Sequence, residues 1–238
     1  MASRKWPTAR VRIVLLPGFH KDGLCDRERF IPCIHPLPRE ELYMSDVIVT
    51  DRWYALIVAG PSGSGKSVVA EVIAKELSLP LIDADDYHSR EAVARMKSGT
   101  PLSDDYRQNW AERILGGMIA WRRRGESVAI ACSCLRRRTR DRFRTYVNEA
   151  RIVGGQVAIA WLDVSPEVLK QRLVKREAAQ THFFPASLLA SQLDAAEPPD
   201  PQREPGVVRI DVGAEPPEGV ARKVWQAVPQ LHPFVPRS

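Results

Sequence analysis

The chain has 238 residues, of which 44% are hydrophobic and 27% charged, enough for one ordinary α/β domain with a short appendage. No apolar run reaches the roughly 18 residues of a membrane span, and the N-terminus lacks the order of a secretory signal, so we expect a cytoplasmic protein. The net charge of +6 is concentrated between residues 121 and 144, and its location matters more than its size.

Residues 1–43 differ from the sequence that follows them. Cys33, several prolines and scattered arginines show no sustained period of 2 or 3.6. We predict a poorly ordered N-terminal extension, or upstream sequence read from an early start codon. A targeting peptide is the alternative, because the first twenty residues contain arginines and no acidic residue. Residues 44–232 are predicted to form one domain, and residues 233–238 a tail.

From Trp53 onward, short apolar segments alternate with helical patterns. The predicted strands are β-branched or alanine-rich and apolar along their length: Tyr54–Ala59, Pro80–Asp83, Ser127–Ala131, Val157–Leu162 and Val207–Asp211. The predicted helices are Lys66–Leu77, Ser89–Lys97, Asp105–Arg124, Arg136–Glu149, Pro166–Glu177, Pro185–Leu193 and Pro217–Val228. This alternation predicts an α/β fold, with a mainly parallel five-stranded sheet covered by helices on both faces.

The strongest motif is Gly60-Pro61-Ser62-Gly63-Ser64-Gly65-Lys66-Ser67, which joins the first predicted strand to the first predicted helix. Its glycines allow backbone conformations that turn successive N–H groups toward an anion, and the following helix adds its dipole. Lys66 brings a compact positive charge to the β and γ phosphates, and the Ser67 hydroxyl is placed to ligate Mg²⁺. The motif predicts binding of ATP and Mg²⁺ by residues Gly60, Ser62, Gly63, Ser64, Gly65, Lys66 and Ser67, but does not identify the second substrate.

The second predicted strand ends in Asp83-Ala84-Asp85-Asp86-Tyr87-His88. We expect this end to lie beside the phosphate loop, at the open edge where α/β proteins bind ligands. Asp85 is the favoured candidate to accept the proton of an attacking hydroxyl or to hold a magnesium-bound water, and Asp83 is expected to orient its neighbours. A solitary histidine such as His88 is more often structural than catalytic, so the residues alone leave its role open.

The arginine-rich stretch contains nine arginines against Glu126 and Asp141. It could bind nucleic acid, serve an enzyme that handles a polyphosphate, or form a solvated helix face. Aromatic residues do not alternate with the arginines, so a base-stacking surface is poorly supported. Cys132 and Cys134 stand one residue apart in an apolar run, unlike metal-binding pairs, and we expect reduced thiols in the core.

Several motifs occur in a fixed order along the chain. They are Gly60–Ser67, Asp83-x-Asp85-x-x-His88, Ser98–Leu102, Asp104-Asp105-x-Arg107-x-x-Trp110, Cys132-Ser133-x-Leu135, Arg172-Leu173, Arg176, His182–Phe184 and Ser191-Gln192 followed by Glu197-Pro198-Pro199. Over about residues 54 to 228 they resemble the gluconokinase family of small P-loop kinases, which is related in fold to shikimate and nucleoside monophosphate kinases. The resemblance implies transfer of the ATP γ-phosphate to the terminal hydroxyl of D-gluconate, giving 6-phospho-D-gluconate, by a homodimer that needs neither a nucleic acid nor a membrane.

The resemblance also implies roles for individual residues. Lys66, Asp85 and Arg136 would be catalytic, and Ser67 and Asp85 would hold the metal. Arg172 and Arg176 would bind ATP from a lid of about residues 170–184. The substrate would be bound by Asp85, His88, Arg107, Trp110, Ser133, Arg137, His182 and Gln192. For Arg107 the chemistry is clear, because a guanidinium binds a carboxylate through two parallel hydrogen bonds.

Three departures from the family's pattern leave the substrate open. Val68 replaces a threonine, Arg136 and Arg137 replace two lysines, and the stretch Glu177–Thr181 is longer and lacks a glycine. One alternative is therefore a P-loop kinase for a different small hydroxy acid, shikimate-like or another aldonate. The other is a nucleotide-dependent module that associates with nucleic acid. A guanine-reading switch is disfavoured, because the sequence contains no Asn-Lys-x-Asp motif.

Overall fold

The computed structural model describes residues 53–149, 155–179 and 183–228 of the chain. The proposed extension, residues 1–43, and the proposed tail, residues 233–238, lie outside this part. Five parallel strands form one sheet in the order β2-β3-β1-β4-β5. The strands are β1 (Tyr54–Ala59), β2 (Leu81–Asp83), β3 (Val128–Cys132), β4 (Gln156–Asp163) and β5 (Val207–Asp211).

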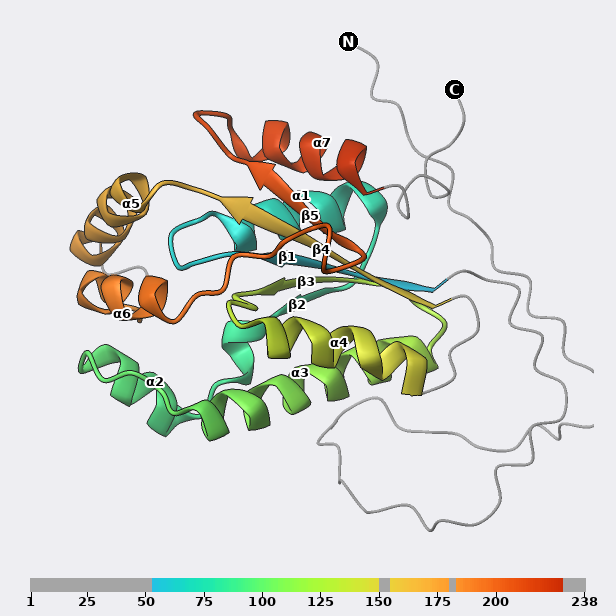
Figure 1. Cartoon of the computed structure of the whole chain (residues 1–238), viewed down its shortest axis with the longest axis horizontal. Coiled ribbons are helices and arrows are strands. Elements are labelled where there is room, and N and C mark those ends of the chain that lie inside the picture. Colours follow the sequence, from blue (N-terminus) through green and yellow to red (C-terminus); the bar gives the residue numbers. More distant parts are fainter. Residues whose placement is uncertain (1–52, 150–154, 180–182, 229–238) are drawn as a thin grey trace, which may run out of the picture. The chain divides into compact units, whose positions relative to one another are not determined.

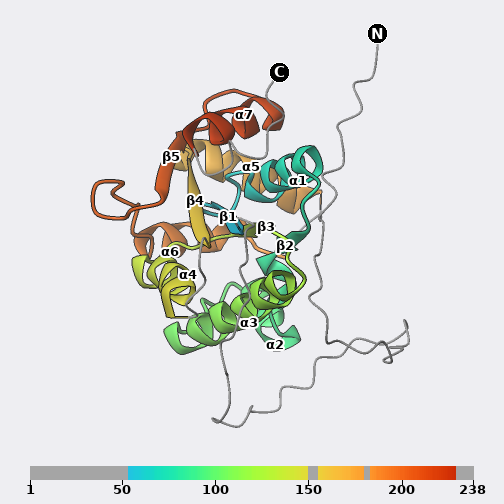
Figure 2. The same cartoon turned by 90° about the vertical axis from the view of Figure 1, so that its right-hand side faces the viewer.

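Helices cover both faces of the sheet. They are α1 (Lys66–Leu77), α2 (Arg90–Lys97), α3 (Asp104–Arg123), α4 (Arg137–Glu149), α5 (Pro166–Ala178), α6 (Leu189–Asp194) and α7 (Pro217–Ala227), with short 3-10 helices η1 (Ala84–Tyr87) and η2 (Ala186–Leu188). Helices α1 and α7 lie on one face, and α3 and α4 on the other (Figures 1 and 2). Helices α2, α5 and α6 lie beyond the carboxyl ends of the strands, where parallel sheets bind their ligands (Figure 1).

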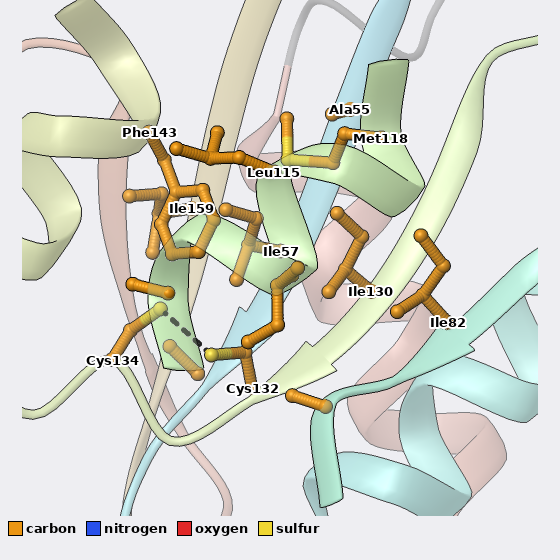
Figure 3. Close-up of a cluster of buried hydrophobic side chains, with 14 of the residues drawn as sticks. Ala55, Ile57, Ile82, Leu115, Met118, Ile130, Cys132, Cys134, Phe143 and Ile159 are labelled. Atoms are coloured by element: carbon orange, nitrogen blue, oxygen red, sulfur yellow. Dashed lines mark hydrogen bonds between the residues drawn. The ribbon is translucent and has the colours of Figure 1, made fainter. Parts of the chain in front are cut away.

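The alternation of side chains along each strand supplies two cores. On β1, Ala55 and Ile57 join the cluster against α3 and α4, part of which is drawn in Figure 3. Leu56 and Val58 join the cluster against α1 and α7. Because both faces of the strands are buried, their sequences are apolar throughout instead of alternating, and this is why the strands were predictable.

All five strands and all seven helices of the prediction are present, with ends that differ by at most a few residues. Two details were wrong. The stretch Ala84–Tyr87, for which no element was predicted, forms η1, and the segment that begins at Pro185 opens as η2 before α6. Within the described residues, no helix is both long and apolar enough to span a bilayer.

The position of β2 also differs from the expectation. We expected its carboxyl end beside the phosphate loop, but β3 lies between β2 and β1. The chain leaves β1, forms α1 and skips one strand position before β2, and β3 later fills the gap. The segment after β3 is therefore inserted between the phosphate loop and Asp85, and it becomes the middle of the site.

Candidate active site

A pocket with about 840 Å³ of space, partly open to solvent, lies beyond the carboxyl ends of the strands. Its walls come from the phosphate loop, η1, α3, the segment after β3, and α6. The structure brings together in this wall the predicted residues Ser62, Lys66, Asp85, His88, Arg107, Trp110, Ser133, Arg136 and Gln192. Residues that are up to 130 positions apart in the sequence therefore share one cavity.

The phosphate loop, residues 60–67, follows β1 directly and leads into α1. Gly63 has a φ of 87°, and a Cβ there would lie 3.2 Å from the Leu169 carbonyl oxygen and 3.3 Å from Leu173 Cγ, so this glycine lets α5 pack onto the loop. Gly65, with a φ of 94°, caps the N-terminus of α1.

Within the described residues, the loop holds a buried cation without a carboxylate partner and a buried hydroxyl without a hydrogen-bond partner. Lys66 is only 8% exposed, and no carboxylate in the described part of the chain lies within ion-pair distance of it. The buried Ser64 hydroxyl has no hydrogen-bond partner among the described residues. A buried cation without a partner is unfavourable, and a phosphate group would neutralise it. Ser67, at the start of α1, and Asp85 offer the hard oxygen ligands that Mg²⁺ prefers. The site thus fits a magnesium-bound nucleotide.

Asp85 is held in place by η1. The Asp83 carboxylate caps this short helix by accepting a hydrogen bond from Asp85 N at 3.0 Å, as expected for a residue that orients its neighbours. The Trp110 indole donates to the Ala84 carbonyl at 2.8 Å and fastens η1 to α3. Asp86, the next residue, is exposed. The turn therefore directs one carboxylate into the pocket and the adjacent one to solvent.

His88 faces Asp85, with 3.9 Å between Nε2 and Asp85 Oδ1. The Tyr106 hydroxyl accepts hydrogen bonds from Ser89 N at 2.9 Å and from Arg113 Nη2 at 3.1 Å. Its own proton is then available to Nδ1 of His88, which lies 3.3 Å away. We infer a neutral imidazole that carries its proton on Nε2 and presents it toward the Asp85 carboxylate.

The surroundings of His88 favour the same neutral form. Its ring stacks on Trp110, with 4.8 Å between ring centroids and an interplanar angle of 2°. Burial lowers the pKa of His88, an effect that Asp85 partly opposes and Arg113 reinforces. The role that the sequence left open is thus specified in part: His88 belongs to the pocket wall.

The lowered pKa of His88 predicts a pH dependence of stability. The unfolded chain binds a proton at His88 as the pH falls below about 6.5, whereas the folded chain resists protonation to a lower pH. The contribution of neutral His88 to the free energy of unfolding should therefore be fully present above about pH 6.5. It should decrease as the pH falls toward the pKa of His88 in the folded chain. We expect the melting temperature to fall more steeply between pH 7.5 and 5.5 in the wild type than in His88→Gln. Parallel pH profiles of the two melting temperatures would contradict this.

Ser133 and Arg136 enter the pocket from the segment between β3 and α4. The Ser133 carbonyl accepts a hydrogen bond from Gly60 N at 3.2 Å, which ties this segment to the phosphate loop. The Arg136 guanidinium lies 3.5 Å from Asp104 Oδ1 and 3.9 Å from Glu197 Oε1. Its buried Nε–H has no partner among the described residues, so it still has a donor to offer.

Arg137 was predicted to bind substrate, but its side chain is not part of the pocket wall, and substrate binding by Arg137 stays a prediction. Its side chain is 51% exposed and points to Asp141, with 3.6 Å between Arg137 Nε and Asp141 Oδ2. Arg137 is the first residue of α4. Arg136 precedes the helix and lines the pocket, whereas the Arg137 side chain lies along α4 toward Asp141, one helical turn further on.

Arg172 and Arg176 reach the phosphate loop region from α5. Arg172 Nη1 lies 3.3 Å from the Gly63 carbonyl oxygen and 3.5 Å from that of Ser64. Burial lowers the pKa of Arg176, and the charge of Asp85 acts in the opposite direction. Closure of a lid by these residues stays a prediction.

Gln192, on α6, contacts the loop from the other side. Its Oε1 accepts a hydrogen bond from Ser62 N at 2.7 Å, and its Nε2 donates to Ser62 Oγ at 3.3 Å. Helices α5 and α6 pack on each other through Leu169, Leu173 and Leu189. His182, also predicted to bind substrate, lies outside the described residues.

Two contributors were not predicted from the sequence, Tyr106 and Arg113. Tyr106 accepts a hydrogen bond from Ser89 N, just after η1, and Arg113 donates to Tyr106 and, through Nε, to the Tyr87 carbonyl of η1 at 3.0 Å. Residues 106, 110 and 113 follow the spacing of one helix face. Once Trp110 was a candidate, this spacing was the signal that could have identified the other two.

Comparison with known proteins supports one family. The family model described as an AAA domain matches residues 56–199. The chain is 36% identical over 166 residues to a probable gluconokinase of Xenopus tropicalis, covering 66% of this chain and 84% of that protein. It is 35% identical over 158 residues to the thermosensitive gluconokinase of Escherichia coli, covering 66% and 79%.

Solved structures agree. A gluconokinase from Sinorhizobium meliloti matches with a TM-score of 0.60 and 36% identity, covering 77% of this chain and 94% of that one. A sugar kinase from a Janibacter species matches with a TM-score of 0.65 and 34% identity, covering 78% and 99%.

Proposed function

The chain belongs to the gluconokinase family, and from this premise we infer that it is a kinase that phosphorylates gluconate at the expense of ATP. The observation within the site that best supports this substrate is Arg107. Its guanidinium lines the pocket, and among the described residues no carboxylate lies within ion-pair distance of it. Burial lowers the pKa of Arg107, so the pocket holds a partly desolvated positive charge that an acidic substrate would neutralise.

The pocket suggests an orientation for the sugar acid. We propose that the carboxylate of gluconate pairs with Arg107, and that its terminal hydroxyl lies at Asp85. Asp85 would accept the proton of that hydroxyl as it attacks, and the Nε2–H of His88 would orient the carboxylate of Asp85. Trp110 and Ser133 would contact the chain of hydroxyl groups between these ends.

At the donor end, the phosphate loop and Lys66 would hold the phosphates of ATP. Arg136, Arg172 and Arg176 would stabilise negative charge on the transferring group. When bound by Ser67 and Asp85, Mg²⁺ would neutralise charge on the β and γ phosphate oxygens. A homodimer and a cytoplasmic location stay predictions.

The Arg107 assignment predicts a selective effect. In Arg107→Gln the charge-assisted pair with the substrate carboxylate is lost, so the KM for gluconate should rise about 10- to 100-fold. The KM for ATP should change by less than about threefold, because Arg107 is assigned to the carboxylate of the sugar acid and the phosphates are assigned to the phosphate loop. Coupled ADP-release kinetics measure both constants, with the exposed Arg95→Gln on α2 as the matched control. Equal changes in the two KM values would contradict the assignment.

The substrate is tested by a panel of sugar acids and other hydroxy acids in the same assay. D-gluconate should stimulate ADP release well above the background ATPase rate, and shikimate should not. If another acid stimulated release and gluconate did not, the substrate assignment would be overturned while the kinase assignment stood. This experiment bears on the main alternative, a related kinase with a different acceptor.

The ion pairs of the arginine-rich stretch, residues 121–144, weaken the alternative that this stretch binds nucleic acid. Six of its arginines lie within ion-pair distance of carboxylates: Arg136, Arg137, Arg138, Arg140, Arg142 and Arg144. Charges neutralised within the protein release few counterions on binding to a phosphodiester backbone. These six arginines are better explained by their ion pairs within the protein, one of which, that of Arg140, is buried.

A further inference from the structure

The segment between β3 and α4, residues 133–136, has no regular secondary structure, yet all four of its residues line the pocket. We call it the acceptor segment. It lies in the middle of the site, between the phosphate loop and η1. An irregular segment can aim Ser133 and Arg136 accurately only if its backbone is fixed by specific partners.

Cys134 shows that the segment is under constraint. Its φ is 42°, in the left-handed region that residues with a side chain rarely adopt. Its side chain is buried in the core, where its thiol donates to Cys132 Sγ at 3.2 Å (Figure 3). Burial raises the pKa of the Cys134 thiol, which therefore stays protonated. Such a conformation persists only where surrounding contacts determine it.

Arg140, on the first turns of α4, supplies those contacts. Its Nη1 donates to the Cys134 carbonyl at 2.9 Å and to the Leu135 carbonyl at 3.1 Å. The guanidinium is 0% exposed and lies over the Trp161 ring, 5.6 Å from the centroid. It does not line the pocket. Within the part of the chain that the structure describes, Arg140 acts on the site through these hydrogen bonds to the backbone of the acceptor segment.

Glu204 fixes Arg140 in turn. It accepts from Arg140 Nε at 2.8 Å through Oε2 and from Nη2 at 2.7 Å through Oε1, and it is 2% exposed. These hydrogen bonds lower the pKa of Glu204. Glu204 belongs to a proline-rich strap, residues 197–206, which contacts the acceptor segment a second time where Glu197 N donates to the Leu135 carbonyl at 2.9 Å.

A buried ion pair is a weak source of stability, since two apolar side chains of similar volume often stabilise a core equally well. The geometry here uses what only arginine provides. Two N–H groups engage the carboxylate, and a third nitrogen still reaches two carbonyls of a neighbouring segment. Lysine has the charge but lacks this planar fork.

We propose that Arg140 and Glu204 are positioning residues for the acceptor pocket, holding the acceptor segment so that Ser133 faces the sugar acid and Arg136 faces the transferring phosphoryl group. The proposal rests on the proposed function and adds to it two residues that never touch the substrate. The proposal also gives the proline-rich strap a role, because the strap contains Glu204, whose carboxylate orients Arg140.

Kinetics of two variants test the proposal. In Arg140→Lys the charge stays but the bonds to the two carbonyls cannot all form, so the KM for gluconate should rise about tenfold or more. The KM for ATP should change by less than about twofold, because Arg140 bonds to the carbonyls of residues 134 and 135, whereas the phosphate loop bonds to the Ser133 carbonyl. The double variant Arg140→Met/Glu204→Leu replaces both charges by apolar groups. We expect a melting temperature well above that of Arg140→Met alone, with the KM for gluconate still raised.

The matched control is Val224→Ala, a destabilising change in the core on the opposite face of the sheet. It should lower the melting temperature without the selective change in KM. Recovery of the gluconate KM in the double variant, or an unchanged gluconate KM in Arg140→Lys, would overturn the proposal. Arg140→Lys decides the question if Arg140→Met does not fold. If the wild type itself failed to phosphorylate gluconate, the proposed function would fail instead.

Discussion

Lys66→Ala is expected to lower kcat/KM for ATP about 1,000-fold. Lys66 is buried at the start of α1 and has no carboxylate partner among the described residues, so its charge is available to the phosphates. The charge that spreads over the γ-phosphoryl group in the transition state would lose its nearest fixed cation. The methylene chain of lysine is replaced by a small side chain beside an open pocket, so the fold should be retained.

The coupled ADP-release assay measures this effect at saturating gluconate. Lys75→Ala is the matched control, because Lys75 lies on the same helix and is exposed at its last turn. The control should retain wild-type kinetics within about twofold, as expected for a surface substitution. A Lys66→Ala protein with full activity would contradict both the phosphate site and the kinase assignment.

Asp85→Asn is expected to reduce kcat about 1,000-fold, with little change in the KM for ATP. The amide is nearly isosteric with the carboxylate but cannot accept the proton of the attacking hydroxyl. The backbone of η1 should be preserved, because its cap is the Asp83 carboxylate, which accepts from the backbone N of residue 85 whatever its side chain.

Asp86→Asn provides the matched control for this effect. It makes the same chemical change one residue further on, on a side chain that faces solvent. Circular dichroism should show the same fold for both variants. Comparable losses of kcat in the two proteins would indicate a general effect of charge near η1, and would remove Asp85 from its assigned role.

The sequence predicted most of the fold because its strongest signals are local. Strands such as β1 are apolar along their whole length, and helices such as α2 and α3 begin after Ser89 and Ser103, whose hydroxyls cap them. Strand order is not a local property. The insertion of β3 between β1 and β2 depends on which surfaces pack best. The sequence of β2 itself does not indicate this strand order.

The candidate site was predictable where one motif contains the chemistry, as in the phosphate loop. It was less predictable where the geometry of a neighbour decides. Arg136 and Arg137 look equivalent in the sequence, but the start of α4 separates them. Arg140 was counted only as part of a charged stretch, because its partner Glu204 lies 64 positions away. The substitution at Val68 is also clarified: this side chain is 50% exposed on α1, so replacing threonine there disturbs no packing.

Phosphorylation of gluconate on its terminal hydroxyl would give a product with a distinctive ³¹P NMR spectrum. The most direct test incubates the purified full chain with ATP, Mg²⁺ and D-gluconate and records the proton-coupled ³¹P NMR spectrum of the product. A phosphate monoester on the terminal carbon couples to the protons of a CH₂ group and gives a triplet, which is the predicted result. A doublet would place the phosphate on a secondary hydroxyl and contradict the proposed orientation. No new monoester signal, with ATP left intact, would contradict the function itself.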